Sequence, residues 1–283
     1  MQRSAMRNDL LSIGEVAHLK GVGVKALRYY ERIGVLRPAY VNPDTGYRYY
    51  ALRQMNELDV IVSCVQLGVP LKELADYVSD CGAMDISSLL ERAYILAKEK
   101  LRDTQAILLE LDGYRREIAV QHALRTSPAP YERVLGKRTF LAMPWGHAAF
   151  DAKRYTRAMS ELYGETKRAS MAPLFLQGMI CLPGDGGKEG AEAPEPSWYV
   201  ALEVQALPGE ELAAPPQERG MRLLALPGGT FCGRRVERET FELCYREVFE
   251  EARTASGIDT LLAFEIWDAE LRTDRTIVEV LRG

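Results

Sequence analysis

Basic and tyrosine side chains gather near the start of the chain. Residues 11–55 hold seven lysines and arginines against three acids, whereas the whole chain of 283 residues carries a net charge of −4. Cationic side chains neutralise phosphate, and hydroxyl groups donate to phosphate oxygens, so this stretch favours contact with nucleic acid. The side chains expected at that contact are Ser12, Val24, Lys25, Arg28, Tyr29, Tyr47, Arg48 and Tyr49.

Acidic and aromatic side chains form a second set in the last half of the chain. Glu203, Glu265 and Glu279 each lie in an expected strand, and the two-residue period of a strand is expected to turn all three toward a groove. A carboxylate beside aromatic rings suits a lipophilic cation, since each ring adds a cation–π attraction of about 0.5–2 kcal/mol. The expected ligand contacts are Trp145, Tyr199, Glu203, Phe231, Glu265, Trp267 and Glu279.

Two short helices are expected to position the basic set. Ser12, with Glu15 three residues later, predicts a capping box that begins the first helix. The inner stripe of this helix is expected at Val16, Ala17 and Leu19. Glycines on either side of a turn then separate it from the second helix.

The second helix is predicted over Val24–Arg32, with Leu27 facing inward. The composition of Asn42–Gly46 is typical of a turn, which would join two strands in a hairpin. At least one tyrosine of the second strand is expected to pack inward. Two further helices are predicted, over Ala51–Leu67 and Pro70–Ser79.

The motifs SIGEVA, ALRYYE, Gly-Val-Leu-x-Pro and NPDTGYRYY follow one another in an order and spacing that resemble the DNA-binding domain of MerR-family transcription regulators. The resemblance implies a winged helix-turn-helix over residues 10–80 that binds double-stranded promoter DNA. Val24 and Lys25 are expected to lie nearest the base edges. Phosphate and backbone contacts are expected chiefly from Arg28, Tyr29, Arg48 and Tyr49. It also implies an activator that bends and untwists an overlong spacer, so that RNA polymerase can use both promoter elements.

Residues 84–122 contain one glycine and no proline, and they predict a single long helix. Its inner positions recur at spacings of four and three residues, which is typical of a coiled-coil seam. They are Leu90, Tyr94, Ala97, Leu101, Thr104, Leu108, Leu111, Arg115 and Ile118. Because the chain lacks a second long helix to cover this seam, a homodimer is expected. The resemblance implies the same, through an antiparallel coiled coil.

Two similar halves are predicted over residues 130–283, beyond a proline-containing linker. The motif LAMPWG at 141–146 matches LALPGG at 224–229, and each is expected to close a strand before a helix. The helices are predicted at 152–168 and 239–256. Two strands should follow each helix, at 174–181 and 198–205, and at 263–267 and 276–281. The glycine-rich segment 184–196 is expected to be a flexible loop without chemistry.

The expected fold class is therefore α+β: an N-terminal winged helix-turn-helix, a long dimerisation helix, and a C-terminal duplicated strand-helix-strand-strand domain. This last domain resembles the GyrI-like effector-binding domain of multidrug-sensing MerR-type regulators. That resemblance implies that Glu265 meets cationic drugs and that Glu279 is a second acid of the pocket. It makes a small lipophilic or cationic molecule the expected ligand.

Several classes of protein are not expected. No run of about 18 uncharged apolar residues is present, so a membrane protein is not expected, and the first residues lack the apolar region of a secretory signal. The cytoplasm is the expected location. Five cysteines without a CxxC spacing predict neither disulfides nor a metal site, and no cofactor is expected. Cys81 is expected to be a packed residue rather than a metal ligand.

The sequence leaves two alternatives to a ligand-responsive regulator. Paired carboxylates beside a tryptophan can support acid–base chemistry, and some proteins that resemble the C-terminal domain are hydrolases. Because no serine or cysteine nucleophile has an evident histidine partner, no enzyme activity is expected. The other alternative is a constitutive DNA-binding protein whose C-terminal domain only stabilises the dimer.

Overall fold

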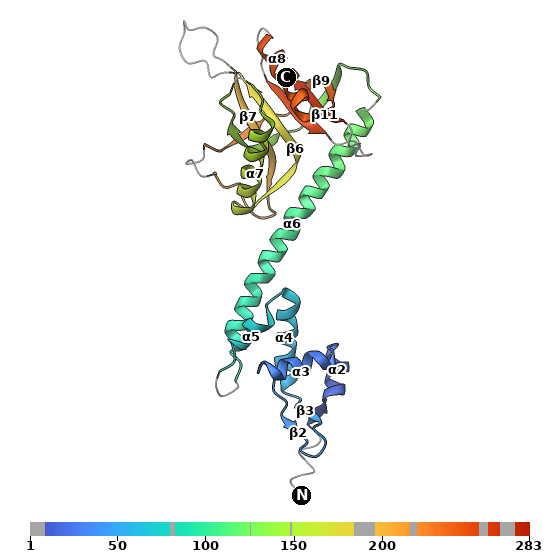
Figure 1. Cartoon of the computed structure of the whole chain (residues 1–283), viewed down its shortest axis with the longest axis vertical. Coiled ribbons are helices and arrows are strands. Elements are labelled where there is room, and N and C mark those ends of the chain that lie inside the picture. The colour runs from blue at the N-terminus through green and yellow to red at the C-terminus, as the bar shows by residue number, and fades with distance from the viewer. Residues whose placement is uncertain are drawn as a thin grey trace. The chain divides into compact units, whose positions relative to one another are not determined.

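The computed structural model describes residues 9–79, 83–124, 126–147, 149–183, 196–215, 220–254, 260–266 and 275–283. The chain divides into two compact units, Met1–Leu101 and Arg102–Gly283, and both contain helices and strands (Figure 1), which confirms the α+β class. Cys81, Trp267 and the segment 184–195 lie outside the described residues. Among the described residues, none of the helices combines the length and the apolar composition that crossing a bilayer requires.

The N-terminal unit places short helices around a three-stranded antiparallel sheet with the order β1-β3-β2 (Figure 1). Its elements are β1 (Leu10–Ser12), α2 (Ile13–Lys20), α3 (Val24–Arg32), β2 (Tyr40–Val41), β3 (Arg48–Ala51), α4 (Gln54–Leu67) and α5 (Leu71–Ala75). The β2–β3 hairpin, hereafter the wing, follows the helix pair α2–α3. This order confirms the predicted winged helix-turn-helix.

Local sequence explains where α2 and α3 begin and end. The Ser12 backbone N–H donates to Glu15 Oε2 over 2.7 Å, and the Glu15 N–H donates to Ser12 Oγ over 3.3 Å, which confirms the capping box. Gly21 ends α2 in the left-handed region, with a φ of 62°. The helix α3 spans the predicted residues, and Leu27 is fully buried.

Leu19 does not belong to the inner stripe of α2, so this part of the prediction was wrong. Its side chain is 62% exposed, whereas Ile13 and Val16 are buried. At 3.6 residues per turn, Leu19 points about 120° away from Ile13. Ile13, the first residue of the helix, lies in the core with Val16 instead.

The two helices after the wing are shorter than predicted. Ala51 belongs to β3, because it pairs with β1, and its N–H donates to Gln54 Oε1 over 3.0 Å. Gln54 therefore begins α4. The helix α5 ends at Ala75, and beyond it the Ser79 N–H donates to the Ala83 carbonyl over 2.9 Å.

The long helix α6 (Ile86–Leu124) begins in the first unit and ends in the second, and it occupies the segment where one long helix was predicted. Its predicted seam is largely uncovered within one chain. Leu90, Leu101 and Leu108 are 50%, 58% and 56% exposed. Leu89, on another side of the helix, is fully buried in the core of the N-terminal unit.

The C-terminal unit carries an eight-stranded antiparallel sheet with the order β4-β9-β11-β10-β6-β7-β5-β8 (Figure 1). Its elements are β4 (Tyr131–Leu135), β5 (Arg138–Pro144), α7 (Ala152–Arg168), β6 (Met171–Leu182), β7 (Ser197–Ala206), β8 (Arg222–Leu226), β9 (Gly229–Arg238), α8 (Phe241–Thr254), β10 (Leu261–Ile266) and β11 (Thr276–Arg282). When β4–β7 are matched with β8–β11, the strand order is the same from either end. The predicted duplication is therefore confirmed.

Each half has one strand more than predicted, and the two short motifs are not equivalent. LAMPWG ends β5, the second strand of its half, whereas LALPGG ends β8, the first strand of its half. The strand β9 comes between LALPGG and α8. The motifs matched because both are the ends of apolar strands that are followed by proline and glycine. This pattern does not depend on which strand of the half it ends. The halves also exchange their first strands, since β4 pairs with β9 and β8 pairs with β5.

The sheet has a different cover on each face. Residues of α7 and α8 pack on one face together with Val200, Leu202 and Val204, which is the apolar face predicted for β7. The C-terminal half of α6 lies on the other face, where the Tyr114 ring meets the Phe175 ring edge-on with their centroids 5.3 Å apart. The sheet is thus enclosed between helices of the same unit.

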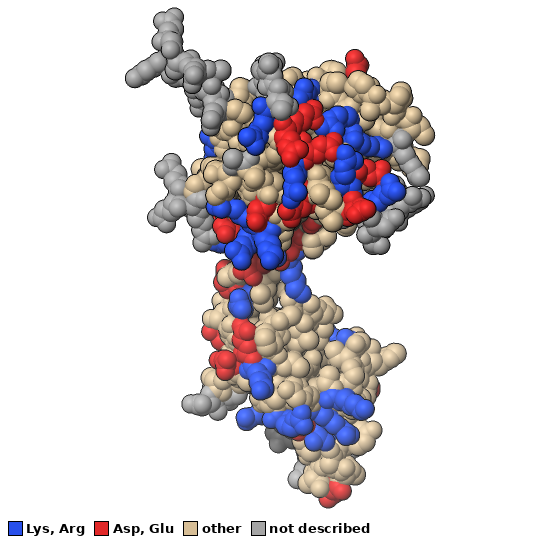
Figure 2. Space-filling view, turned by 45° about the horizontal axis from the view of Figure 1, so that its top comes forward, with Lys and Arg blue, Asp and Glu red and all other residues tan. Residues whose placement is uncertain are grey.

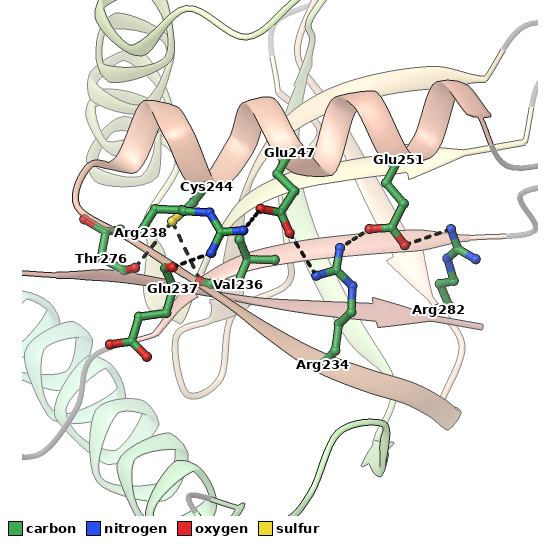
Figure 3. A network of polar contacts seen from close by, with 9 residues as sticks. All are labelled: Arg234, Val236, Glu237, Arg238, Cys244, Glu247, Glu251, Thr276 and Arg282. Carbon is green, nitrogen blue, oxygen red and sulfur yellow. Dashed lines mark hydrogen bonds and ion pairs between the residues drawn. The ribbon is translucent and has the colours of Figure 1, made fainter.

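Ion pairs join α8 to β9 and β11 (Figure 3). Glu247 accepts from Arg238 and from Arg234, the latter over 3.5 Å. Glu251 accepts from Arg234 and from Arg282, the latter over 3.2 Å. The side chains are between 30% and 48% exposed, so each pair contributes less than about 1 kcal/mol. These ion pairs therefore orient α8 on the sheet more than they stabilise the fold.

Candidate DNA-contact surface and ligand site

The helix α3 presents a basic face to solvent because its apolar residues turn inward. Leu27 packs in the core, whereas Lys25, Arg28 and Arg32 are exposed. Their spacing of three and four residues places all three on one side of the helix. Figure 2 shows lysine and arginine side chains gathered in a band across the N-terminal unit. Arg32 was not among the predicted contacts, although its spacing from Arg28 could have revealed it.

The wing is held by its own turn and by an ion pair to α3. Asn42 Oδ1 accepts from the Asp44 N–H over 2.9 Å and from the Thr45 N–H over 3.3 Å. Arg48 Nε donates to Glu31 Oε2 over 2.5 Å. Arg48 thus joins the wing to α3. The sequence predicted a phosphate contact for Arg48 but not this ion pair.

The tyrosines of the wing divide between surface and core. Tyr47 is 55% exposed, and the Tyr49 ring lies between Tyr40 and Tyr47, with centroid distances of 5.9 and 6.0 Å. Tyr50 is fully buried, as expected for at least one of these residues. Tyr29 of α3 is partly buried beneath Arg32, whose Cζ lies 4.7 Å from the ring centroid.

Some of the basic residues and predicted DNA contacts of the N-terminal unit have partners within the unit. Lys20 pairs with Asp59 over 2.6 Å and joins α2 to α4. The Ser12 hydroxyl takes part in the cap of α2, and it donates to Glu15 Oε2 over 2.6 Å. Val24 begins α3 and is partly buried. The exposed charge of this surface therefore comes mainly from α3.

Glu265 lies on the face of the sheet that α7 and α8 cover. The Tyr155 hydroxyl donates to Glu265 Oε1 over 2.5 Å, and the Gln177 amide donates to Oε2 over 3.2 Å. Burial raises the pKa of Glu265 to about 7, although both hydrogen bonds act to lower it. Among the described residues, no lysine, arginine or histidine forms an ion pair with this acid. Glu265 is thus a partly buried acid without a positive partner in the described part of the chain.

A cluster of aromatic rings adjoins this acid through Tyr155. The Phe150 and Tyr245 rings stack with their centroids 4.6 Å apart, and the Tyr155 and Phe241 rings approach to 5.0 Å. Trp145 lies 5.8 Å from Phe150 in the same cluster. Burial raises the pKa of the Tyr155 hydroxyl, which therefore stays protonated and remains a hydrogen-bond donor. The site combines negative charge with apolar rings, a composition that suits a lipophilic cation.

The predicted groove with three glutamates is wrong, because Glu203 and Glu279 lie on the opposite face of the sheet. Facing residues of antiparallel strands point to the same side, and the register sets Glu265 opposite Val278 and Glu279 opposite Phe264. The prediction assigned faces within each strand but assumed that the faces of different strands coincide.

Both of these acids have local partners. Glu203 pairs with Arg138 over 2.6 Å. Glu279 accepts from the Tyr131 hydroxyl over 2.8 Å and from the Gln121 amide over 2.9 Å. Burial raises the pKa of each acid, and the neighbouring arginine acts to lower it. Their surroundings indicate structural roles.

Two predicted aromatic contacts lie away from Glu265 as well. Tyr199 and Phe231 belong to the core of the opposite face, and Arg222 Cζ lies 4.2 Å from the Tyr199 ring centroid. Tyr155 and Gln177 contact Glu265 and were not predicted. Tyr155 lies on the apolar face of α7. A tyrosine hydroxyl on such a face needs a hydrogen-bond partner, and this was the signal in the sequence that could have identified it.

A groove of about 1050 Å³ runs along the first turns of α7. Phe150 and Ala158 form part of its wall, and charged residues, among them Asp151 and Arg157, form its rim. Phe150 also contacts Tyr155, with ring centroids 5.5 Å apart, so the groove approaches Glu265 through two aromatic side chains. Among the described residues, no three histidine, cysteine or acidic side chains gather in a way that could hold a metal ion.

Comparison with known proteins gives a family match in the N-terminal unit. Residues 11–81 match the model of the MerR HTH family regulatory proteins. The chain is 51% identical over 69 residues to the multidrug-efflux transporter 1 regulator of Bacillus subtilis, an alignment that covers 24% of this chain and 25% of that protein. It is 34% identical over 113 residues to the mercuric resistance operon regulatory protein of Shigella flexneri, covering 38% of this chain and 72% of that protein.

The chain spans only part of its multidrug-regulator relatives, 25% and 56% of the lengths of the transporter 1 and transporter 2 regulators. Among solved structures, the EcmrR–DNA complex aligns over 96% of this chain and 98% of its own, with 18% identity and a TM-score of 0.33.

Proposed function

The chain belongs to the MerR family of helix-turn-helix regulatory proteins, and from that premise we propose that it is a transcription regulator that binds promoter DNA and responds to a lipophilic cation. The family assignment rests on the N-terminal unit. The ligand class rests on one observation in the C-terminal unit: the partly buried acid Glu265 lies beside an aromatic cluster and has no positive partner in the described residues.

The DNA contact is proposed for α3 and the wing. Lys25 and Arg28 are exposed on the outer side of α3, where they can reach a major groove and its phosphates. Tyr47 and Tyr49 would place hydroxyl groups against the DNA backbone, and Arg48 would hold the wing in position for that contact.

A homodimer is proposed because the seam of α6 is exposed in a single chain. Apolar residues at spacings of three and four residues need a partner helix, and a second copy supplies the same seam. A symmetric pair would also place two α3 helices on one DNA molecule. Regulation would then act in the cytoplasm through RNA polymerase, by distortion of the promoter spacer.

The role proposed for the ligand follows from electrostatics. A cation beside Glu265 would supply the missing positive charge and favour the ionised carboxylate. Its binding energy can change transcription only if the DNA-bound dimer has two conformations with different affinities for the cation. Hydrolysis is not proposed, since Glu265 and the other two predicted acids lie on opposite faces of the sheet.

A pair of matched compounds tests this proposal. Methyltriphenylphosphonium is a cation, and triphenylphosphine oxide is a neutral molecule with the same three rings. Calorimetric titration of the full chain should show saturable binding of the cation, at least about tenfold tighter than the neutral compound, which corresponds to about 1.4 kcal/mol. The variant Glu265→Gln should lose this preference. Equal binding of both compounds, or an unchanged preference in the variant, would place the ligand site elsewhere.

A further inference from the structure

A continuous series of polar side chains leads from Glu265 to the long helix α6. Gln177 Nε2 donates to Glu265 Oε2 over 3.2 Å, and the Tyr163 hydroxyl donates to Gln177 Oε1 over 3.0 Å. The Tyr163 and Tyr114 side chains are neighbours, and the hydroxyl group of each influences the pKa of the other. The Tyr114 hydroxyl donates to Glu110 Oε1 over 2.8 Å. The series thus passes from β10 through β6 and α7 to α6.

These groups are shielded from water, which strengthens their mutual contacts. Tyr163, Gln177 and Glu265 are partly buried, and burial raises the pKa of Tyr163 to about 12. In the part of the chain that the structure describes, the titratable groups that face Glu265 are Tyr155 and Tyr163 from α7 and Tyr245 from α8. All three are tyrosines with raised pKa values, so they remain neutral donors while the carboxyl changes its charge.

The number of hydroxyl hydrogens in the series makes its hydrogen bonds sensitive to the charge of Glu265. Tyr114 and Tyr163 each carry one hydroxyl hydrogen, yet they adjoin three acceptors: the carboxylate of Glu110, the carbonyl of Gln177 and the oxygen of the other tyrosine. The three contacts cannot all be hydrogen bonds at once. The orientation of the Gln177 amide therefore decides whether the contact between the two tyrosines has a hydrogen.

The charge of Glu265 sets that orientation. When Glu265 is ionised, Gln177 donates its N–H to the carboxylate, and its carbonyl takes the Tyr163 hydrogen. When Glu265 is protonated, the carboxyl O–H can donate to the carbonyl of a reversed amide. The amide N–H then donates to the Tyr163 oxygen, and Tyr163 donates to Tyr114.

We propose that Gln177 and Tyr163 form a relay that transmits the ionisation state of Glu265 to Tyr114 of α6. This inference rests on the proposed function, because the cationic ligand is what would hold Glu265 ionised. Tyr163 and Tyr114 are positioning residues, since neither donates to Glu265. The relay ends on the helix whose exposed seam is proposed to join two subunits, so it offers a route from ligand to dimer.

Hydrogen–deuterium exchange in the full chain without ligand tests the relay directly. Glu265→Gln imitates the neutral acid, and it should change the exchange rate of α6 around Glu110 and Tyr114 by about threefold or more. In a Tyr163→Phe background the same substitution should have no further effect on α6. The matched control is Tyr131→Phe, which removes another buried hydroxyl of this unit, one that donates to Glu279. In that background the response to Glu265→Gln should persist.

The relay is overturned if Glu265→Gln leaves the exchange of α6 unchanged, or if Tyr163→Phe does not suppress the change. A ligand experiment separates this result from the proposed function. Tyr163→Phe should bind methyltriphenylphosphonium within about twofold of the wild-type affinity, yet lose the effect of the cation on DNA binding. A variant that responds to the cation like the wild type also contradicts the relay. Failure of the cation to bind the wild type contradicts the proposed function, whereas the exchange result stands on its own.

Discussion

Glu265 differs from Glu203 and Glu279, the two buried acids predicted with it, in what surrounds it. Glu203 faces Arg138, and Glu279 has Arg133 nearby at 3.7 Å together with two neutral donors. Within the described residues, Glu265 receives hydrogen bonds only from the neutral groups of Tyr155 and Gln177. A buried carboxylate without a positive partner is costly, so its ionisation costs folding free energy. Two predictions follow from this property at the scale of single residues.

The first concerns stability. The pKa of Glu265 is raised from 4.5 to about 7 in the folded chain, so folding favours the protonated acid. The stability of the ligand-free chain should therefore fall as the pH rises from about 4.5 through 7, and then level off. Glu265→Gln removes this loss. Denaturant unfolding should find the variant more stable than the wild type by up to roughly 3 kcal/mol at pH 8, but not at pH 4.

The matched control for stability is Glu161→Gln, which changes an exposed acid of α7. It should leave the free energy of unfolding within about 0.5 kcal/mol of the wild type at both pH values. An equal effect of Glu265→Gln at pH 4 and pH 8 would show that the acid titrates normally.

The second prediction concerns ligand affinity. A permanently charged cation binds the ionised acid best, and the ionised fraction of a group with a pKa of about 7 rises with pH. The affinity for methyltriphenylphosphonium should increase about tenfold between pH 6 and pH 8. Titration calorimetry at three pH values measures this change. A flat profile in the wild type would mean that Glu265 does not face the cation.

A third prediction concerns the DNA surface. Arg28→Ala should weaken binding to many DNA sequences and reduce the slope of log affinity against log salt by about 0.9, because one phosphate contact is lost. Lys20→Ala is the matched control, since Lys20 is already paired with Asp59. Fluorescence anisotropy over a range of salt concentrations compares them. Equal slopes for the wild type and Arg28→Ala would remove Arg28 from the interface.

At the scale of elements, the sequence specified individual helices and strands better than their mutual arrangement. The limits of α3 and the capping box of α2 follow from local signals, and the structure reproduces them. The faces of β7 were also correct. Local signals depend only on neighbouring residues, so one sequence contains enough information to predict them.

The predictions that failed were those that depended on the register between strands and on the order of the strands. Strand periodicity gave the face of Glu265 relative to Ala263, but only pairing with β11 shows that Glu279 points the other way. The repeat was misaligned by one strand because LALPGG ends β8 and not β9. Tyr155 and Gln177 were missed for the same reason, since their elements meet Glu265 only in the folded sheet.

The seam of α6 gives the prediction that belongs to this scale. Replacing both Leu101 and Leu108 by Glu places charge in the exposed apolar stripe, and it should convert a dimer into a monomer. Light scattering with size-exclusion chromatography measures the mass. Glu99→Lys, a change of charge at another exposed position of α6, is the matched control and should stay dimeric. A double variant that remains dimeric would locate the subunit contact elsewhere.

At the scale of the whole molecule, the two units carry different halves of the proposed function. The N-terminal unit has the exposed cations of α3, whereas the C-terminal unit has the partly buried acid Glu265. The helix α6 is continuous between them, and its C-terminal half is where the proposed relay ends. Regulation requires that a ligand in one unit changes the affinity of the other unit for DNA, and by linkage the effect must be reciprocal.

The measurement that tests this account most directly is transcription from the DNA upstream of the gene that encodes this chain, with purified RNA polymerase and the full chain. Methyltriphenylphosphonium should change the amount of transcript with the wild type, whereas triphenylphosphine oxide should not, and Glu265→Gln should give no response to either compound. Transcript levels that stay the same with the cation, or a response that Glu265→Gln retains, would contradict the account.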